Sequence, residues 1–183
     1  MTTPVETLVE YEIDPKDSLF TVQAYASITH SPKFAIRNFS GSAMFVPGSL
    51  CKTSVRSEIA AESLEIQDEV SALDRREIER IMFREILRTQ DFPKIIFESS
   101  VTKVNRVNEF LYRVHVAGAL TLCGITRDHT FETQVTIGPD TLRANGSFTL
   151  LQTDYGIRPV TAAGGLLKVR DVLQFRFFIT ARR

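Results

Sequence analysis

The side chains best suited to acid–base or metal chemistry in this sequence are three histidines and two cysteines, and they are scattered along the chain. They are His30, His115, His129, Cys51 and Cys123. No group of them has the spacing of a metal-binding cluster or of a redox-active thiol pair. The sequence also contains no nucleophile elbow, zinc-protease motif, phosphate-binding loop or dinucleotide-binding fingerprint. We therefore predict no metal site, no cofactor and no catalytic residue, and we do not expect an enzyme.

His129 differs from the other two histidines because its neighbours are apolar. Side chains two residues apart in a strand share one face, so His129 would share its face with Phe131 and Val135. Two interpretations of this histidine stay open. It could bond the polar head group of a ligand, or it could be a structural residue whose partner is the backbone or an aspartate.

The elements that would position His129 form a predicted hairpin at residues 112–137. Its first strand alternates apolar with polar residues, and the pattern resumes after a turn at 123–126. A strand of this kind has one face in water and one face away from it. The residues expected to face inward are Tyr112, Val114, Val116, Gly118, Leu120 and Leu122, and then His129, Phe131, Thr133, Val135 and Ile137.

The same alternation recurs along the chain and indicates about eight strands in all. An antiparallel sheet with one continuous apolar face can cover that face by closing into a barrel. We therefore expect an all-β protein in which residues 1–183 form a single domain, a barrel with an apolar interior. Further strands are predicted at residues 17–27, 34–46, 53–61, 95–99, 142–151 and 173–179.

Residues 74–88 break the strand pattern and predict one amphipathic helix inserted between strands. Asp74, with Glu77 three residues later, resembles a capping box at its start. The helix could plug an end of the barrel or pack on its outside, and both arrangements stay open. Its apolar face would consist of Ile78, Ile81, Met82 and Ile86, which recur at helical spacing.

Charge and composition exclude two classes of partner. Basic and acidic residues number 22 each, so the sequence indicates no surface for nucleic acid or for an anionic membrane. The N-terminal residues do not resemble a signal peptide, and no stretch has transmembrane length. We expect a cytoplasmic protein that is not an integral membrane protein. Phe outnumbers Tyr by 13 to 4 and Trp is absent, which suits a hydrocarbon-rich core or cavity.

Several short motifs occur in an order that is similar to one known family. They are Ile13-Asp14-Pro15-Lys16-Asp17-Ser18, Asn38-Phe39-Ser40-Gly41, Asp91-Phe92-Pro93-Lys94-Ile95-Ile96-Phe97-Glu98-Ser99, Gly118-Ala119-Leu120-Thr121-Leu122-Cys123-Gly124-Ile125-Thr126-Arg127 and Asp154-Tyr155-Gly156-Ile157. With a helix in the expected place, they resemble the YceI-like family, the lipocalin-like polyisoprenoid-binding proteins, over roughly residues 10–181. The resemblance implies an eight-stranded antiparallel lipocalin-like barrel with a helix near one end. It also implies a hydrophobic bore that can hold an isoprenoid chain, such as a quinone or polyprenyl tail.

The sequence departs from the family at two positions. The family commonly has a histidine before the serine of the first motif and another toward the end of that strand. Here these positions are Asp17 and Ala26. A head-group contact through those histidines is therefore not expected in this chain.

The function that we predict from the resemblance is binding or transport of an apolar isoprenoid-type lipid in the bore. Space inside is favoured by the small residues expected to face inward, which are Ala24, Ala26, Gly118, Ala144 and Gly146. Two alternatives stay open. The barrel could be an enzyme acting on an apolar small molecule, or it could be filled by its own side chains and act through its surface, for instance as a homodimer. The candidate bore-lining residues are Phe20, Val22, Ala24, Phe97, Val114, Val116, Gly118, His129, Phe131, Val135, Phe148, Phe175 and Phe177.

Overall fold

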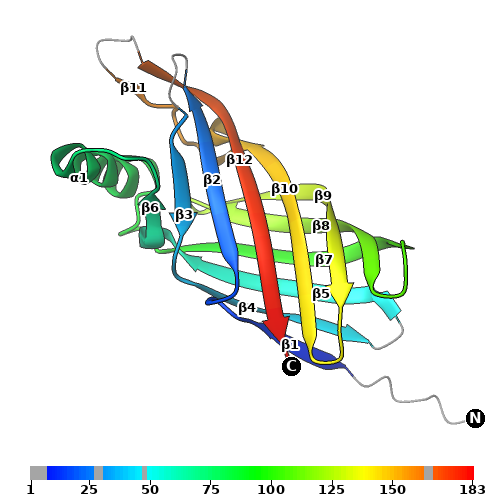
Figure 1. Ribbon diagram of the computed structural model, residues 1–183. Coiled ribbons are helices and arrows are strands. Elements are labelled where there is room, and N and C mark those ends of the chain that lie inside the picture. Colours follow the sequence, from blue (N-terminus) through cyan, green and yellow to red (C-terminus); the bar gives the residue numbers. More distant parts are fainter. Residues whose placement is uncertain (1–7, 27–30, 47–48, 163–166) are drawn as a thin grey trace, which may run out of the picture.

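The computed structural model describes residues 8–26, 31–46, 49–162 and 167–183, which form one closed sheet with a helix at one end (Figure 1). The strands are β1 (Val9–Ile13), β2 (Leu19–Ala26), β3 (Lys33–Ile36), β4 (Phe39–Val46), β5 (Ser49–Ala60), β6 (Leu64–Ile66), β7 (Lys94–Arg106), β8 (Leu111–Leu122), β9 (Ile125–Ile137), β10 (Thr141–Leu151), β11 (Thr161–Ala162) and β12 (Leu167–Arg182). Helix α1 (Ala72–Arg80) continues into a π-helical segment (Ile81–Ile86), and short 3-10 turns lie at Ala61–Ser63 and Gln152–Tyr155.

The barrel consists of eight antiparallel strand positions around its circumference, which we call staves. Three of these staves are bent, and each bent stave is made of two shorter strands. β1 and β2 both pair with β12 and form the first stave. β4 and β3 pair with them and form the second, and β5 and β6 form the third. The pairing of β1 with β12, at Ile13 and Ala181, closes the ring. The predicted eight-stranded antiparallel barrel with one inserted helix is confirmed.

The first sequence motif forms the corner between β1 and β2. The Asp14 backbone N–H donates to the carbonyl of Thr180 at 2.8 Å, and the Thr180 N–H donates to the Ser18 hydroxyl at 2.9 Å. The Arg182 guanidinium lies 2.9 Å from the Asp14 carboxylate and also pairs with Asp17. These contacts fix the bent stave to β12 at the point where it changes direction.

The β8–β9 hairpin has the predicted alternation but a tighter turn. β8 ends at Leu122 and β9 begins at Ile125, so Cys123 and Gly124 alone form the turn. Both have positive φ, 50° and 74°, as a two-residue turn of type I′ requires. A Cβ on Gly124 would also lie 2.5 Å from the Phe92 ring, so glycine is needed there for space as well.

The helix begins earlier than predicted and has a different cap. α1 starts at Ala72, and the Ser71 hydroxyl accepts a hydrogen bond from the Asp74 N–H at 3.1 Å. The interpretation of Asp74 and Glu77 as the capping box was wrong, because Ser71 is the residue whose side chain reaches the free N–H group. Glu77 pairs instead with Arg80 at 2.9 Å.

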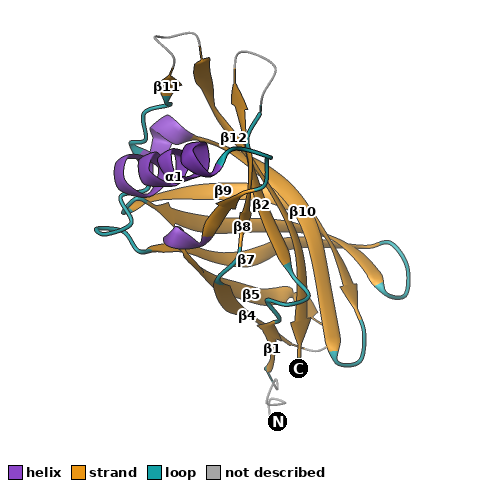
Figure 2. Ribbon diagram, turned by 60° about the vertical axis from the view of Figure 1, so that its left-hand side comes forward, coloured by secondary structure: helices purple, strands orange, loops and turns teal. Residues whose placement is uncertain are grey.

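The helix changes form where it meets the barrel. In the π-helical segment the Leu87 N–H donates to the carbonyl of Met82 at 2.8 Å, and both residues are buried in the core. α1 itself contains no fully buried residue and lies beside the barrel end (Figure 2). The Arg75 guanidinium ties it to β6 by donating to the carbonyl of Ile66 at 3.0 Å. The π-helical segment therefore packs against the barrel end, while α1 stands outside it.

Candidate ligand-binding interior

One group of inward side chains, which we call the aliphatic end, forms a cluster on β8, β9, β10 and β12. It lies toward the start of β8 and β10 and the end of β9 and β12, which are the strand ends farther from α1 in Figure 1. Every member is buried, and the rings of Tyr11 and Phe45 pack beside it with centroids 5.4 Å apart. Close packing of this kind leaves no room for a further molecule. The members of the aliphatic end are Val114, Val116, Val135, Leu142 and Ala181.

A second group, which we call the aromatic lining, lies between the aliphatic end and the helix. Its rings form one continuous path. The ring centroids of Phe131 and Phe148 are 5.2 Å apart, those of Phe148 and Phe175 are 5.1 Å apart, and those of Phe131 and Phe177 are 5.7 Å apart. These rings face inward, yet each is only half-buried, so the interior is less completely filled here. The members of the aromatic lining are Phe20, Phe97, Phe131, Phe148, Phe175 and Phe177.

Two inward glycines make room for these rings. A Cβ on Gly118 would lie 2.6 Å from the Phe97 ring, and a Cβ on Gly146 would lie 2.8 Å from the Phe177 ring. The expectation that Gly118 indicates free space inside is therefore corrected, since the space beside it holds an aromatic side chain of the protein. The glycines let flat rings lie against the strands.

His129 lies at the helix end of the aromatic lining and is bonded to Tyr155. Its Nε2 lies 2.6 Å from the Tyr155 hydroxyl, the two rings are parallel within 5°, and the Phe148 ring lies 5.6 Å away. Tyr155 is fully buried in the 3-10 turn after β10, and His129 is half-buried. The structure thus brings one polar pair to the edge of an otherwise apolar surface.

Burial keeps both members of the pair uncharged near neutral pH. It lowers the pKa of His129 below the usual 6.5, although the carboxylates of Asp154 and Asp128 act in the opposite direction. It raises the pKa of Tyr155 to about 12, and Asp154 adds to that shift while Arg127 opposes it.

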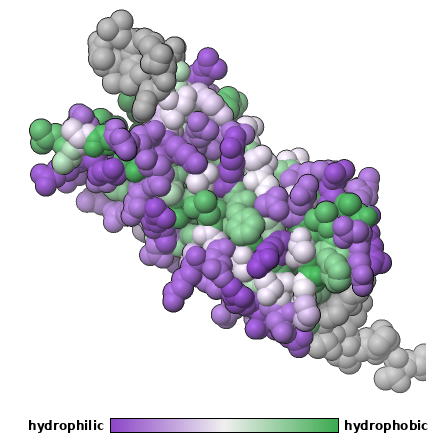
Figure 3. Space-filling view, in the orientation of Figure 1, coloured by the Kyte–Doolittle hydropathy of each residue, from purple (hydrophilic) through white to green (hydrophobic). Residues whose placement is uncertain are grey.

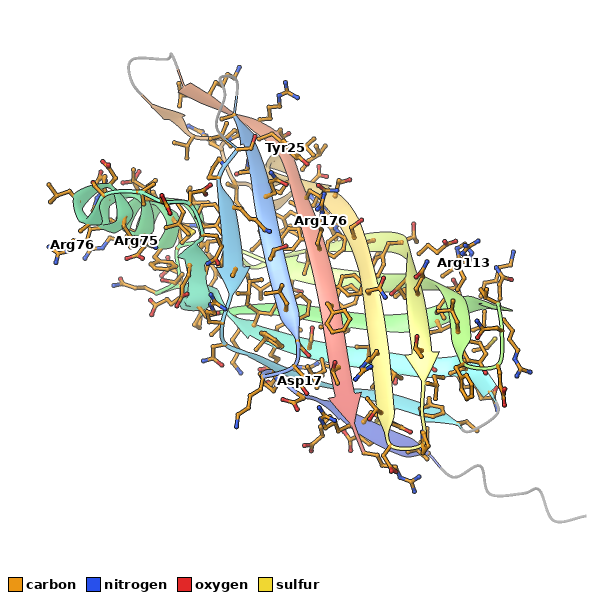
Figure 4. The ribbon with its side chains drawn as sticks, viewed as in Figure 1. Asp17, Tyr25, Arg75, Arg76, Arg113 and Arg176 are labelled. Atoms are coloured by element: carbon orange, nitrogen blue, oxygen red, sulfur yellow. The ribbon has the colours of Figure 1, made fainter. Side chains whose placement is uncertain are left out.

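Charged side chains lie on the outer faces of the strands. Arg113 on β8 pairs with Glu132 on β9 at 3.1 Å, and His115 lies 3.4 Å from the same carboxylate. Figure 4 shows Arg113 and Arg176 outside the sheet, and the face drawn in Figure 3 is mostly hydrophilic. Two surface hollows, about 550 and 410 Å³, are lined mainly by outward residues of β7–β9 and of β1, β4 and β5, and the first also includes Gly118 and His129.

The core contains no buried charge in the part of the chain that the structure describes, where the buried polar side chains are threonine, serine and glutamine. No three His, Cys, Asp or Glu residues within that part are placed to hold a metal ion. None of its helices is long and apolar enough to span a membrane. Its core suits hydrocarbon and offers an anion no counter-charge.

The predicted bore-lining residues thus divide by burial. Val22, Ala24, Val114, Val116 and Val135 are buried by protein side chains, whereas the phenylalanines and His129 are half-buried. His30 lies outside the described residues.

Tyr155 was not among the predicted site residues. It lies outside the strands, so alternation could not reveal it, and its only sequence signal is its place in the Asp154–Ile157 motif. Its partner His129 lies 26 residues earlier on β9, the strand that pairs with β10, and the turn after β10 brings the two side chains together.

Solved structures with this barrel come from several bacteria. BcnA of Burkholderia cenocepacia is similar with a TM-score of 0.72 and 17% identity, over 92% of this chain and 98% of that one. A polyisoprenoid-binding domain from Saccharophagus degradans, implicated in plant cell wall breakdown, has a TM-score of 0.71 and 12% identity, over 94% and 97%. The YCEI protein of Campylobacter jejuni has a TM-score of 0.59 and 13% identity, over 81% and 82%.

Sequence comparison gives one match. No curated protein matches the chain. The family model of the YceI-like domain matches residues 11–181, which include every strand of the barrel except the first two residues of β1 and the last residue of β12. The chain therefore belongs to the YceI-like domain family.

Proposed function

We propose that this protein binds or carries a long apolar lipid, a polyisoprenoid or an isoprenoid quinone, against the aromatic lining of its barrel. The observation that carries the proposal is the incomplete burial of that lining. Its inward phenylalanine rings form an unbroken path and remain only half-buried. The similarity to a polyisoprenoid-binding domain supports the same class of ligand.

A long isoprenoid chain offers enough apolar contact for tight binding. At about 0.3 kcal/mol for each non-hydrogen atom, a chain of about forty carbons gains roughly 12 kcal/mol. This free energy corresponds to a dissociation constant of about a nanomolar. An isoprenoid chain needs few polar contacts, and its methyl branches can lie against the edges and faces of the phenylalanine rings.

The proposal assigns different roles to the predicted residues. Phe20, Phe97, Phe131, Phe148, Phe175 and Phe177 contact the ligand, together with His129 at the helix end of the path. Val22, Ala24, Val114, Val116 and Val135 are core residues that support the barrel, because neighbouring side chains already bury them. Gly118 acts indirectly by positioning Phe97.

Native mass spectrometry of the purified protein, followed by solvent extraction, tests this function. We expect a bound lipid whose extract contains an isoprenoid chain. A protein that carries no lipid and takes up no added isoprenoid hydrocarbon would contradict the proposal.

A pair of variants on β10 separates occupancy from folding. Ala144 faces inward between the aromatic lining and the aliphatic end, and Asn145 beside it faces solvent. Ala144→Trp should abolish lipid occupancy, whereas Asn145→Trp should retain it. Melting temperatures of the same samples show whether a loss of lipid reflects unfolding, and equal occupancy in both variants would argue against an interior site.

A further inference from the structure

We propose that His129, held in place by Tyr155, binds the polar end of the ligand, and that this end is an uncharged hydrogen-bond acceptor, such as a quinone carbonyl, and not a phosphate. The inference rests on the proposed function, because it concerns the same interior. It adds an orientation, in which the polar end lies toward α1 and the chain extends along the aromatic lining.

The position of the pair supports this orientation. The His129 ring contacts Phe148, which stacks on Phe175 at 5.1 Å, so the pair lies where the path of rings ends. Tyr155 follows β10 and holds His129 from the helix side of the barrel. A chain lying against Phe148 and Phe175 therefore brings its end to His129.

The hydrogen bond within the pair determines which imidazole nitrogen is left for a ligand. If Nε2 of His129 carried the proton, the hydroxyl proton of fully buried Tyr155 would have no acceptor among the described residues. Donation from the hydroxyl to Nε2 avoids that cost and places the imidazole proton on Nδ1. Nδ1 has no hydrogen-bond partner within the described part of the chain. In that part, Thr53 Oγ1 is the only side-chain polar atom that is both buried and without a hydrogen-bond partner. Nδ1 is therefore not buried and is accessible.

The charges around the pair favour an uncharged acceptor. The carboxylates of Asp128 and Asp154 lie close enough to act on the pKa of His129. Arg127 is the nearby cation, but its Nε donates to the carbonyl of Asp154 at 3.0 Å and it is exposed. A phosphate at His129 would meet two carboxylates and no buried cation, whereas a carbonyl oxygen needs only the Nδ1–H donor.

Three lipids with the same isoprenoid tail test the inference: a benzoquinone, the plain hydrocarbon and a diphosphate. We expect the quinone to bind the native protein about fivefold more tightly than the hydrocarbon, as one hydrogen bond predicts. The diphosphate should bind more weakly than either. A diphosphate that binds as tightly as the quinone overturns the inference.

His129→Val removes the proposed donor and keeps a side chain suited to a strand. This variant should bind quinone and hydrocarbon equally, with the affinity for hydrocarbon unchanged. Thr130→Val, on the outward face beside it, is the matched control and should keep the native preference. Failure of every lipid to bind the native protein would reject the proposed function, whereas tight hydrocarbon binding with no quinone preference would reject the role of His129 alone.

Tyr155→Phe and a spectroscopic measurement keep the test independent of folding defects. Nitrogen chemical shifts of the His129 ring should show the proton on Nδ1 in the native protein and a mixture of both neutral forms in Tyr155→Phe. Adding the quinone should shift the Nδ1 resonance, and adding the hydrocarbon should not. A proton on Nε2 in the native protein, or equal shifts with both lipids, contradicts the inference.

Discussion

The aliphatic end and the aromatic lining occupy the same barrel and even the same strands, yet they differ in how well they are filled. On β9, Val135 is 8% exposed, whereas Phe131, on the same inward face, is half-buried. On β8 the buried Val114 and Val116 precede Gly118, whose missing side chain is replaced by the ring of Phe97. Both regions are apolar and inward, so hydropathy alone does not separate them.

Side-chain shape accounts for the difference. Short branched side chains interdigitate across the end of a small barrel and fill it to the density of a core. Flat rigid rings, each with two rotatable bonds, contact one another with centroids 5.1–5.7 Å apart along a path, and each ring stays only half-buried. One closed barrel can therefore combine a tightly buried core with a more accessible aromatic surface.

The largest expected effect comes from placing a charge in the aliphatic end. Val114→Asp should lower the free energy of unfolding by at least about 3 kcal/mol, because the carboxylate would be buried without a partner. Arg113→Ala, the outward neighbour, loses only an exposed ion pair and should change stability by less than about 1 kcal/mol. Thermal unfolding of both variants checks this, and similar losses would mean that the strand faces are wrongly assigned.

Truncations on β10 should distinguish the two regions directly. Leu142→Ala in the aliphatic end should cost about 2–5 kcal/mol, since it opens a cavity in packed core. Phe148→Leu in the aromatic lining should cost less than about 1.5 kcal/mol in the lipid-free protein. Urea denaturation measures both, and equal costs would show that the lining is packed as tightly as the core.

A smaller loss is expected where a glycine faces a phenylalanine of the lining. Gly118→Ala should cost about 1–2 kcal/mol, because the new methyl group would displace the Phe97 ring and crowd the Cβ of Ser99. Combining it with Phe97→Leu should recover part of that loss. Strictly additive losses in the double variant would disprove the contact.

The smallest effect is confined to alkaline pH. The folded protein keeps the Tyr155 hydroxyl protonated up to a pKa of about 12, whereas in the unfolded chain it ionises near 10. Its contribution to stability is therefore complete below pH 10 and is lost as the pH rises toward 12. Phenolate absorbance should show a step near pH 12 that Tyr155→Phe removes, and loss of a step near pH 10 in that variant instead would contradict the burial of this hydroxyl.

Local patterns in the sequence were sufficient to predict most of the long strands, their inward faces and the presence of one helix, but not β1 or the second half of β7. Alternation over β8 and β9 is a property of neighbouring residues, and closure of the sheet follows from its apolar face. The cap of the helix was misassigned, although Ser71, three residues before Asp74, carries a local signal for the correct one.

The contents of the interior could not be predicted in the same way. Whether a glycine leaves a gap or holds a ring depends on the neighbouring strand, as Gly118 and Phe97 show. The bond between His129 and Tyr155 joins β9 to the turn after β10, and its formation depends on tertiary structure. Residue type and alternation predict which side chains face inward, but not which of them stay accessible.

Intermolecular NMR contacts between a carbon-13-labelled protein and an unlabelled isoprenoid hydrocarbon test the central claim most directly. We expect nuclear Overhauser effects from the lipid methyl groups to the rings of Phe131, Phe148, Phe175 and Phe177. We expect none to the methyl groups of Val114, which the aliphatic end buries. Contacts to Val114 without contacts to the phenylalanine rings, or a saturated complex with no contact to either, would contradict it.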